Sequence, residues 1–141
     1  MRRSVGLMFG GERGLCARLT ARHSLNHWAA LYRLDAATTR ERVPRLLDLV
    51  GLADRADDRI ESYSRGMKQQ LHLARELIDA ASLLFLGEPT IGLDPVASVL
   101  VWEIIKNLQR EGVTIFLATH YMQEAESLCD CVAFIDDGSI I

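Results

Sequence analysis

The stretch of residues 64–94, SRGMKQQLHLARELIDAASLLFLGEPTIGLD, constrains the fold more than any other part of the sequence. Ser64 can cap a helix by accepting a hydrogen bond from a free amide of the first turn, and apolar residues follow it at helical spacing. The apolar run 83–86 is typical of a buried strand. Asp94, with Pro95 behind it, marks the start of another helix. The sequence therefore predicts a helix, a buried strand and a second helix in an α/β domain.

The segment before this stretch predicts one strand and two helices. Val5–Phe9 alternates as a strand does, and Thr20 is a candidate cap for the helix that follows. Thr38 with Glu41 three residues on forms a capping box and predicts the start of a second helix. Pro44 lies deep enough in that helix that we expect it to kink the helix or delay its start.

The segment after it predicts two more strands and a short helix between them. Residues 113–118 are β-branched and apolar enough to form a buried strand. A helix over Met122–Leu128 leads to a strand over 132–135, and Asp137-Gly138 is a hairpin turn signal.

Size and charge narrow the functional class. The chain has 141 residues, one domain's worth, and its net charge of -3 argues weakly against a nucleic-acid partner. No apolar run approaches the length that spans a bilayer. We therefore expect a cytoplasmic protein whose membrane role, if it has one, comes through a partner.

Four segments resemble the motifs of one family, in that family's order. YSRGMKQ is similar to the signature motif of ABC-type ATPases, LLFLGEPT to their Walker B strand and IGLDP to their D-loop. ATHYMQEAESLCD resembles the switch-histidine segment. The wording is most similar to the ATP-binding subunits of drug- and sodium-efflux exporters, and the resemblance covers nearly the whole chain.

The resemblance implies an incomplete ABC ATPase domain over residues 1–141, with a partial P-loop NTPase-like α/β fold and a mostly parallel sheet core. Residues of about 15–63 would form the helical subdomain, and about 64–141 the core with the signature helix, Walker B, D-loop and switch histidine. It also implies ATP and Mg²⁺ as cofactors. The implied partners are a membrane-spanning permease and a second ATP-binding subunit. The two ATP-binding subunits would bind each other head to tail, and the permease would hold them at the inner face of the cell membrane.

The resemblance assigns nucleotide contacts to the start of the signature helix. Ser64 and Gly66 would present backbone amides to the γ-phosphate, helped by a helix dipole of about half a charge. Arg65 replaces a glycine usual in other branches of the family, and Gln69 belongs to the same nucleotide-contacting set.

The resemblance also assigns roles to three residues farther along the chain. Glu88 matches the general base that polarises the attacking water. His120 matches the switch residue that contacts the γ-phosphate, and Asp94 matches the D-loop aspartate that communicates across the dimer.

Several positions depart from the family pattern. No Gly-Lys pair occurs in the sequence, so the phosphate-loop motif G-x-x-x-x-G-K-[ST] is absent from it. Gly10 or Gly11 stands where the Q-loop glutamine is usual, and Gly87 replaces the aspartate that holds Mg²⁺ through water. We assign no metal ligand, and we expect the chain alone neither to bind ATP tightly nor to hydrolyse it.

Three interpretations stay open. The first is a truncated or degenerate ATP-binding subunit of an efflux transporter, with Met1 as an internal start. The second is a non-catalytic partner that lends Ser64 and Gly66 in trans to an intact ATPase. The third is a DNA-repair or chromosome-maintenance ATPase. Such ATPases insert long coiled coils before the signature motif, and the segment before it here has no sustained heptads, which disfavours this interpretation.

Overall fold

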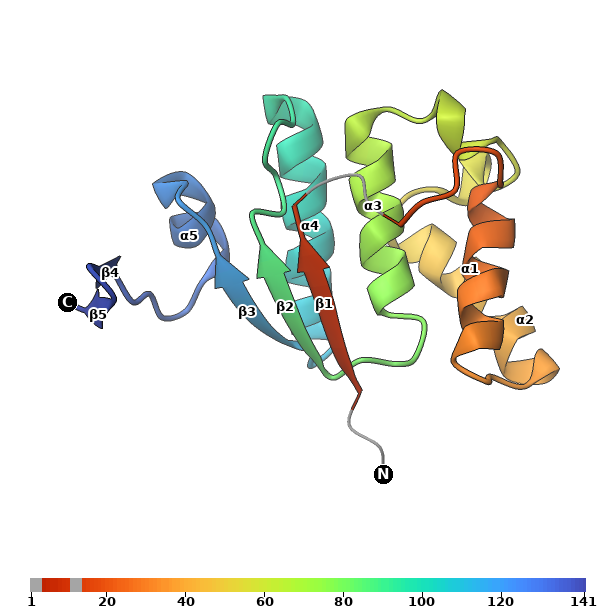
Figure 1. Cartoon of the computed structure of the whole chain (residues 1–141), viewed down its shortest axis with the longest axis horizontal. Coiled ribbons are helices and arrows are strands. Elements are labelled where there is room, and N and C mark those ends of the chain that lie inside the picture. The colour runs from red at the N-terminus through yellow and green to blue at the C-terminus, as the bar shows by residue number, and fades with distance from the viewer. Residues whose placement is uncertain (1–3, 11–13) are drawn as a thin grey trace.

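The computed structural model describes residues 4–10 and 14–141, and its centre is a parallel three-stranded sheet. The strands stand in the order β1 (Val5–Phe9), β2 (Leu83–Gly87) and β3 (Thr114–Ala118), all parallel (Figure 1). Parallel neighbours need long crossover connections, and helices supply them here. The α/β class with a mostly parallel sheet is confirmed.

Helices connect the strands and begin where the strands end. Figure 1 shows α3 and α4 starting at the end of the molecule to which all three strand arrows point. This places two helix N-termini beside the carboxyl edge of the sheet, where open α/β sheets bind ligands. The helices are α1 (Ala21–Leu31), α2 (Ala36–Leu49), α3 (Arg65–Glu76), α4 (Pro95–Arg110) and α5 (Met122–Leu128), with short 3₁₀ turns at Ala53–Arg55 and Ile60–Ser62.

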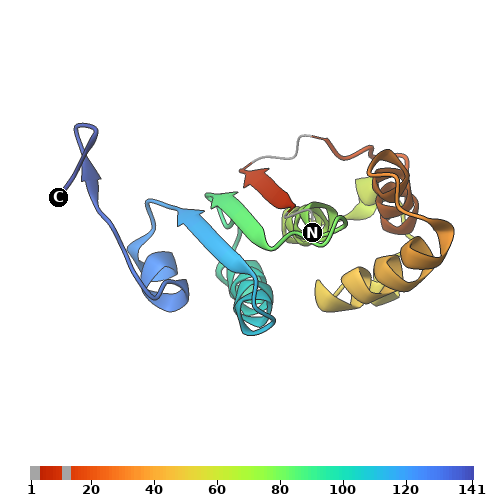
Figure 2. The ribbon, with the colours of Figure 1, turned by 90° about the horizontal axis from the view of Figure 1, so that it is seen from below.

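Only one face of the sheet is covered by helices of the described chain. Figure 2 shows α3 and α4 on the same side of the three strands. Leu84 and Leu86 of β2 point to that side and are 0% and 1% exposed. On the other face Phe9 and Phe116 are 71% and 61% exposed.

The helices α1 and α2 form a layer beyond α3, at the side of the sheet (Figure 1). Both helices contact each other and α3, and their inward side chains, such as Leu25 and Leu47, are buried. Gly51 ends α2 with φ of 75°, and the amide of Leu52 donates to the carbonyl of Leu47. This is a Schellman-type end, in which a glycine takes the left-handed position.

Three of the predicted helix caps are confirmed. The side chains of Thr20, Ser64 and Asp94 each accept a hydrogen bond from the amide three residues on, at 3.1, 3.2 and 2.9 Å. Such caps satisfy one of the four free amides of a first turn.

The prediction for the start of α2 is wrong. Asp35 is the cap and accepts from the amide of Thr38 at 2.7 Å, so Thr38 lies in the first turn. Pro44 lies inside the helix and does not delay its start. Hydrogen bonds from Thr38, first from its backbone amide and then from its side chain, lower the pKa of Asp35. The stability from this cap is therefore present above the unfolded pKa and is lost as pH falls through the folded pKa.

The two carboxyl-terminal strands also differ from expectation. The strand β3 lies at the edge of the sheet and exposes Phe116, so it is not buried on both faces. Residues 132–134 form no strand; β4 (Ile135–Asp136) pairs only with β5 (Ser139–Ile140). Figures 1 and 2 show this hairpin standing apart from the sheet. The predicted turn at Asp137-Gly138 is confirmed, with φ of 45° and 77°.

Among the residues that the structure describes, none belongs to a helix long and apolar enough to cross a membrane.

A matched pair of leucines on the two faces tests this one-sided core. Leu84→Ala should lower the free energy of unfolding by about 2–5 kcal/mol, because it leaves a cavity between the sheet and the helices. Leu7→Ala, at a side chain that is 52% exposed, should lower it by less than about 1 kcal/mol. Urea denaturation followed by circular dichroism measures both, and equal losses would contradict the arrangement.

Candidate functional site

Glu88 and His120 meet at the carboxyl ends of β2 and β3. Oε1 of Glu88 lies 2.8 Å from Nδ1 of His120, which donates to the ionised carboxylate when it carries a proton. The Glu88 side chain is 30% exposed and that of His120 is 62% exposed. The pair expected from separate motifs is therefore in direct contact, and solvent can reach it.

The backbone of Glu88 is held in an uncommon conformation. Its φ is 51°, in the left-handed region that side chains rarely adopt. The amide of Glu88 donates to the carbonyl of Ala118 at 2.8 Å, and its carbonyl accepts from the amide of Ile91 at 3.2 Å. Such strain costs about 1–3 kcal/mol and persists where surrounding contacts fix it, often at functional sites.

Thr119 completes the contacts of the pair. Its hydroxyl accepts from the amide of Tyr121 at 3.0 Å and lies 3.5 Å from Oε2 of Glu88. Sequence reasoning gave Thr119 no role of its own, although its place beside the histidine at a strand end was the available signal. A carboxylate positioned in this way and open to solvent can take a proton from water, as a general base does.

The start of α3 combines exposed and buried positions. Ser64 and Arg65 are exposed, and the Ser64 hydroxyl caps the helix. Gly66 is buried, and a Cβ placed there would lie 2.9 Å from the Cβ of Ala97 in α4. The glycine therefore allows the first turns of α3 and α4 to approach closely, independently of any ligand.

Gln69 and Asp94 make contacts within the protein. Gln69 is 8% exposed, and its side-chain amide donates to the carbonyl of Pro89 at 2.8 Å. It therefore fastens α3 to the turn that follows Glu88. Asp94 is exposed, and its carboxylate accepts from the amide of Ala97 as the cap of α4.

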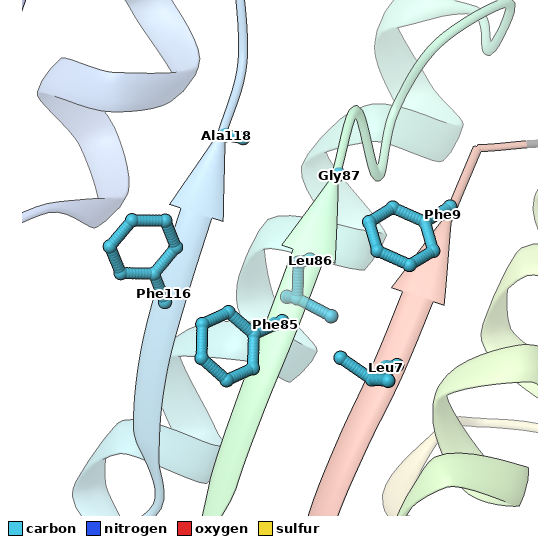
Figure 3. A pocket seen from close by; sticks show the side chains of 7 residues that line it. All are labelled: Leu7, Phe9, Phe85, Leu86, Gly87, Phe116 and Ala118. Atoms are coloured by element: carbon cyan, nitrogen blue, oxygen red, sulfur yellow. The ribbon is translucent and has the colours of Figure 1, made fainter.

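The residues at the end of β2 do not fit a magnesium ion. Gly87 offers no side-chain oxygen, and a Cβ there would lie 2.9 Å from Cδ1 of Phe9. Figure 3 shows Phe9 beside Gly87 in the apolar hollow on the open face of the sheet. Hard divalent cations need several oxygen ligands, and a phenyl ring supplies none. The described residues contain no group of three or more His, Cys, Asp or Glu side chains that could hold a metal.

Gly10 adjoins the same place. Its amide donates to the carbonyl of Gly87 at 2.9 Å, and a Cβ at Gly10 would lie 2.9 Å from Cγ2 of Ile91. A glutamine at this position would have to displace Ile91. Gly11, the other candidate for the Q-loop position, lies outside the described residues.

The fold and the site together define an open α/β protein with polar side chains and helix N-termini at the carboxyl edge of a parallel sheet, the edge at which such proteins bind ligands. The family model described as ABC transporter matches residues 1–91, and the chain belongs to this family. Members bind ATP with Mg²⁺, and the ATP-binding subunits of export systems generally dimerise and pair with membrane permeases.

Curated relatives of this chain include several export proteins. The linearmycin resistance ATP-binding protein LnrL of Bacillus subtilis is 38% identical over 92% of this chain and 42% of its own length. The ABC transporter ATP-binding protein NatA of the same organism is 36% identical over 100% and 57%. The fluoroquinolones export ATP-binding protein Rv2688c of Mycobacterium tuberculosis is 47% identical over 88% and 40%. The chain spans about half the length of the curated relatives it matches.

A double substitution tests the close packing of Gly66 against Ala97. Gly66→Ala should lower the free energy of unfolding by about 1–2 kcal/mol, because the overpacking penalty exceeds the gain in helix propensity. With Ala97→Gly in the background, the same change should no longer destabilise. Urea denaturation of the four proteins measures the coupling, and a Gly66→Ala variant as stable as the parent would refute the close approach.

Proposed function

We propose that this chain acts as part of the ATP-binding subunit of an ABC-type export system, at the cytoplasmic face of a membrane through a permease partner. The contact of 2.8 Å between Glu88 and His120 carries the proposal, because it joins a general base to a phosphate-sensing side chain at the ligand edge of the sheet. The name of the fluoroquinolones export ATP-binding protein, a relative of this chain, supports the transport role.

The N-terminus of α3 would supply the second half of a shared nucleotide site. Ser64 and Arg65 are exposed there, and the positive end of the helix dipole favours a phosphate. In a head-to-tail pair, this surface of one subunit would face the phosphates held by the other. Gln69 and Asp94 would act indirectly, Gln69 by fixing the turn after Glu88 and Asp94 by capping α4.

We further propose that the chain alone neither binds Mg²⁺-ATP tightly nor hydrolyses it. Phosphoryl transfer depends on positioning and on neutralising charge. The 141 residues contain no phosphate-loop lysine, and Gly87 gives no oxygen to a metal. Glu88 and His120 would therefore act only on phosphates positioned by residues outside these 141.

Calorimetric titration tests this proposal. ATP added to the purified chain should bind with a Kd weaker than about 1 mM, a binding free energy of about -4 kcal/mol or less favourable. Mg²⁺ should not strengthen the binding, because Gly87 offers it no side-chain oxygen and Phe9 lies against that position. Radiolabelled phosphate release should equal that of Glu88→Gln. Micromolar binding that depends on Mg²⁺, or turnover that Glu88→Gln abolishes, would refute the proposal.

A second candidate function is a non-catalytic partner that lends its signature helix to an intact ABC ATPase. The exposure of both Ser64 and Arg65 at the start of α3 favours it, because a lending surface must be accessible.

Co-purification tests the second function. The chain, co-expressed with an intact ATP-binding subunit, should be retained with it in the presence of ATP. Ser64→Arg should abolish retention, because its long side chain would occupy the place of the phosphate. Ser139→Arg, on the exposed hairpin far from the site, is the control and should be retained. Equal retention of both variants would rule out this use of the signature helix.

A further inference from the structure

Glu124 is a fully buried carboxylate to which the motifs assign no role. It lies in the first turn of α5 and is 0% exposed. Its Oε1 accepts from the hydroxyl of Thr90 at 2.6 Å and from the indole Nε1 of Trp102 at 3.1 Å. Its Oε2 is buried without a hydrogen-bond partner among the described residues. Burying a carboxyl group is unfavourable unless hydrogen bonds compensate for its lost hydration, and an apolar side chain of similar volume is often as stable or more so.

The hydrogen bonds of Glu124 join three elements. Thr90 lies in the turn between β2 and α4, Trp102 in α4, and Glu124 in α5. Gln109 adds a second tie between α4 and α5, since its side-chain amide donates to the carbonyl of Leu128 at 2.8 Å. The link to Thr90 differs from these helix–helix ties, because it holds a turn.

That turn begins with the candidate base. Thr90 stands two residues after Glu88, and Glu124 stands four residues after His120. The amide of Glu124 donates to the carbonyl of Tyr121 at 3.1 Å, which connects the start of α5 rigidly to the residue after His120. Side chains thus join the two segments through Glu88 and His120 and through Thr90 and Glu124, in addition to the bonds of Glu88 to the end of β3, from its amide to the Ala118 carbonyl and from the Thr119 hydroxyl.

The exposed link alone is a weak constraint. His120 is 62% exposed, and solvent competes for its hydrogen bond to Glu88. The Thr90–Glu124 link is excluded from solvent, where a hydrogen bond is stronger than in water. The backbone bond from Glu88 to Ala118 holds the strand ends together, and the buried Thr90–Glu124 link holds the turn after Glu88 against the start of α5.

We propose that Glu124 is a positioning residue that, by holding Thr90, keeps the Glu88 carboxylate within hydrogen-bond distance of the His120 imidazole. Its importance for turnover rests on the proposed function. The geometric claim does not, so it is tested without nucleotide.

Nitrogen NMR of the His120 ring tests the proposal on the full chain. The ¹⁵N signals of an imidazole report which nitrogen carries the proton and whether it is hydrogen-bonded, and the His120 signals are assigned by their loss in His120→Asn. Glu88→Ala provides the reference for a ring without its partner. Glu124→Leu should shift the signals in the direction seen with Glu88→Ala. Glu124→Gln keeps a carbonyl oxygen for Thr90 and should leave them near those of the parent.

Two further variants keep the test decisive. Thr90→Val removes only the hydroxyl and should shift the His120 signals as Glu124→Leu does, so it decides the question if Glu124→Leu does not fold. Glu126→Leu changes an exposed glutamate of the same helix and should have no effect. Loss of stability in urea with unchanged His120 signals would assign Glu124 a structural role only and overturn the proposal. A failure of ATP-dependent function would leave these spectra unchanged, so the two outcomes are separable.

Discussion

The turn between β2 and α4 is held by hydrogen bonds from both sides, and the candidate site depends on it. From α3, the amide of Gln69 reaches the carbonyl of Pro89, and from α5 the carboxylate of Glu124 reaches the hydroxyl of Thr90. The side chains of Gln69 and Glu124 are buried, so water does not compete for these two hydrogen bonds. With the turn fixed on two sides, Glu88 can remain in a left-handed conformation that a free loop would leave.

The fold was predictable at most positions where a structure is decided within a few residues, the cap of α2 at Asp35 being the exception. Caps at Ser64 and Asp94 involve a side chain and an amide three positions away, so the sequence alone specifies them. The burial of a strand was predictable only where its neighbouring strands are part of the described structure. Residues 113–118 are apolar enough for a central strand, but β3 lies at the sheet edge in the described structure. Residues 132–134 likewise form no strand in the described structure, where only the carbonyl of Phe134 accepts from the amide of Ile141 at 2.9 Å.

The site divides in the same way. The order of the motifs located Glu88 and His120, and their contact follows because the carboxyl ends of adjacent parallel strands meet at one edge. The hydrogen bond from Gln69 to Pro89 joins residues 20 positions apart, and the one from Thr90 to Glu124 joins residues 34 positions apart. No local sequence pattern predicts such pairs. A glutamate near the start of a helix, as Glu124 is, would ordinarily be explained by the helix dipole.

Gly10, one of the two candidates for the Q-loop position, and Gly87 are neighbours, and this links their effects. The amide of Gly10 donates to the carbonyl of Gly87, with the ring of Phe9 over Gly87 and the side chain of Ile91 close to Gly10. An oxygen-bearing side chain restored at either place would meet an apolar group that now fills the space. The candidate base Glu88 and His120 thus lie on one side of the β2 end, whereas apolar packing occupies the other side, where a cation would need oxygen ligands. Restoring metal chemistry would therefore require changing Phe9 or Ile91 together with the glycine that each one covers.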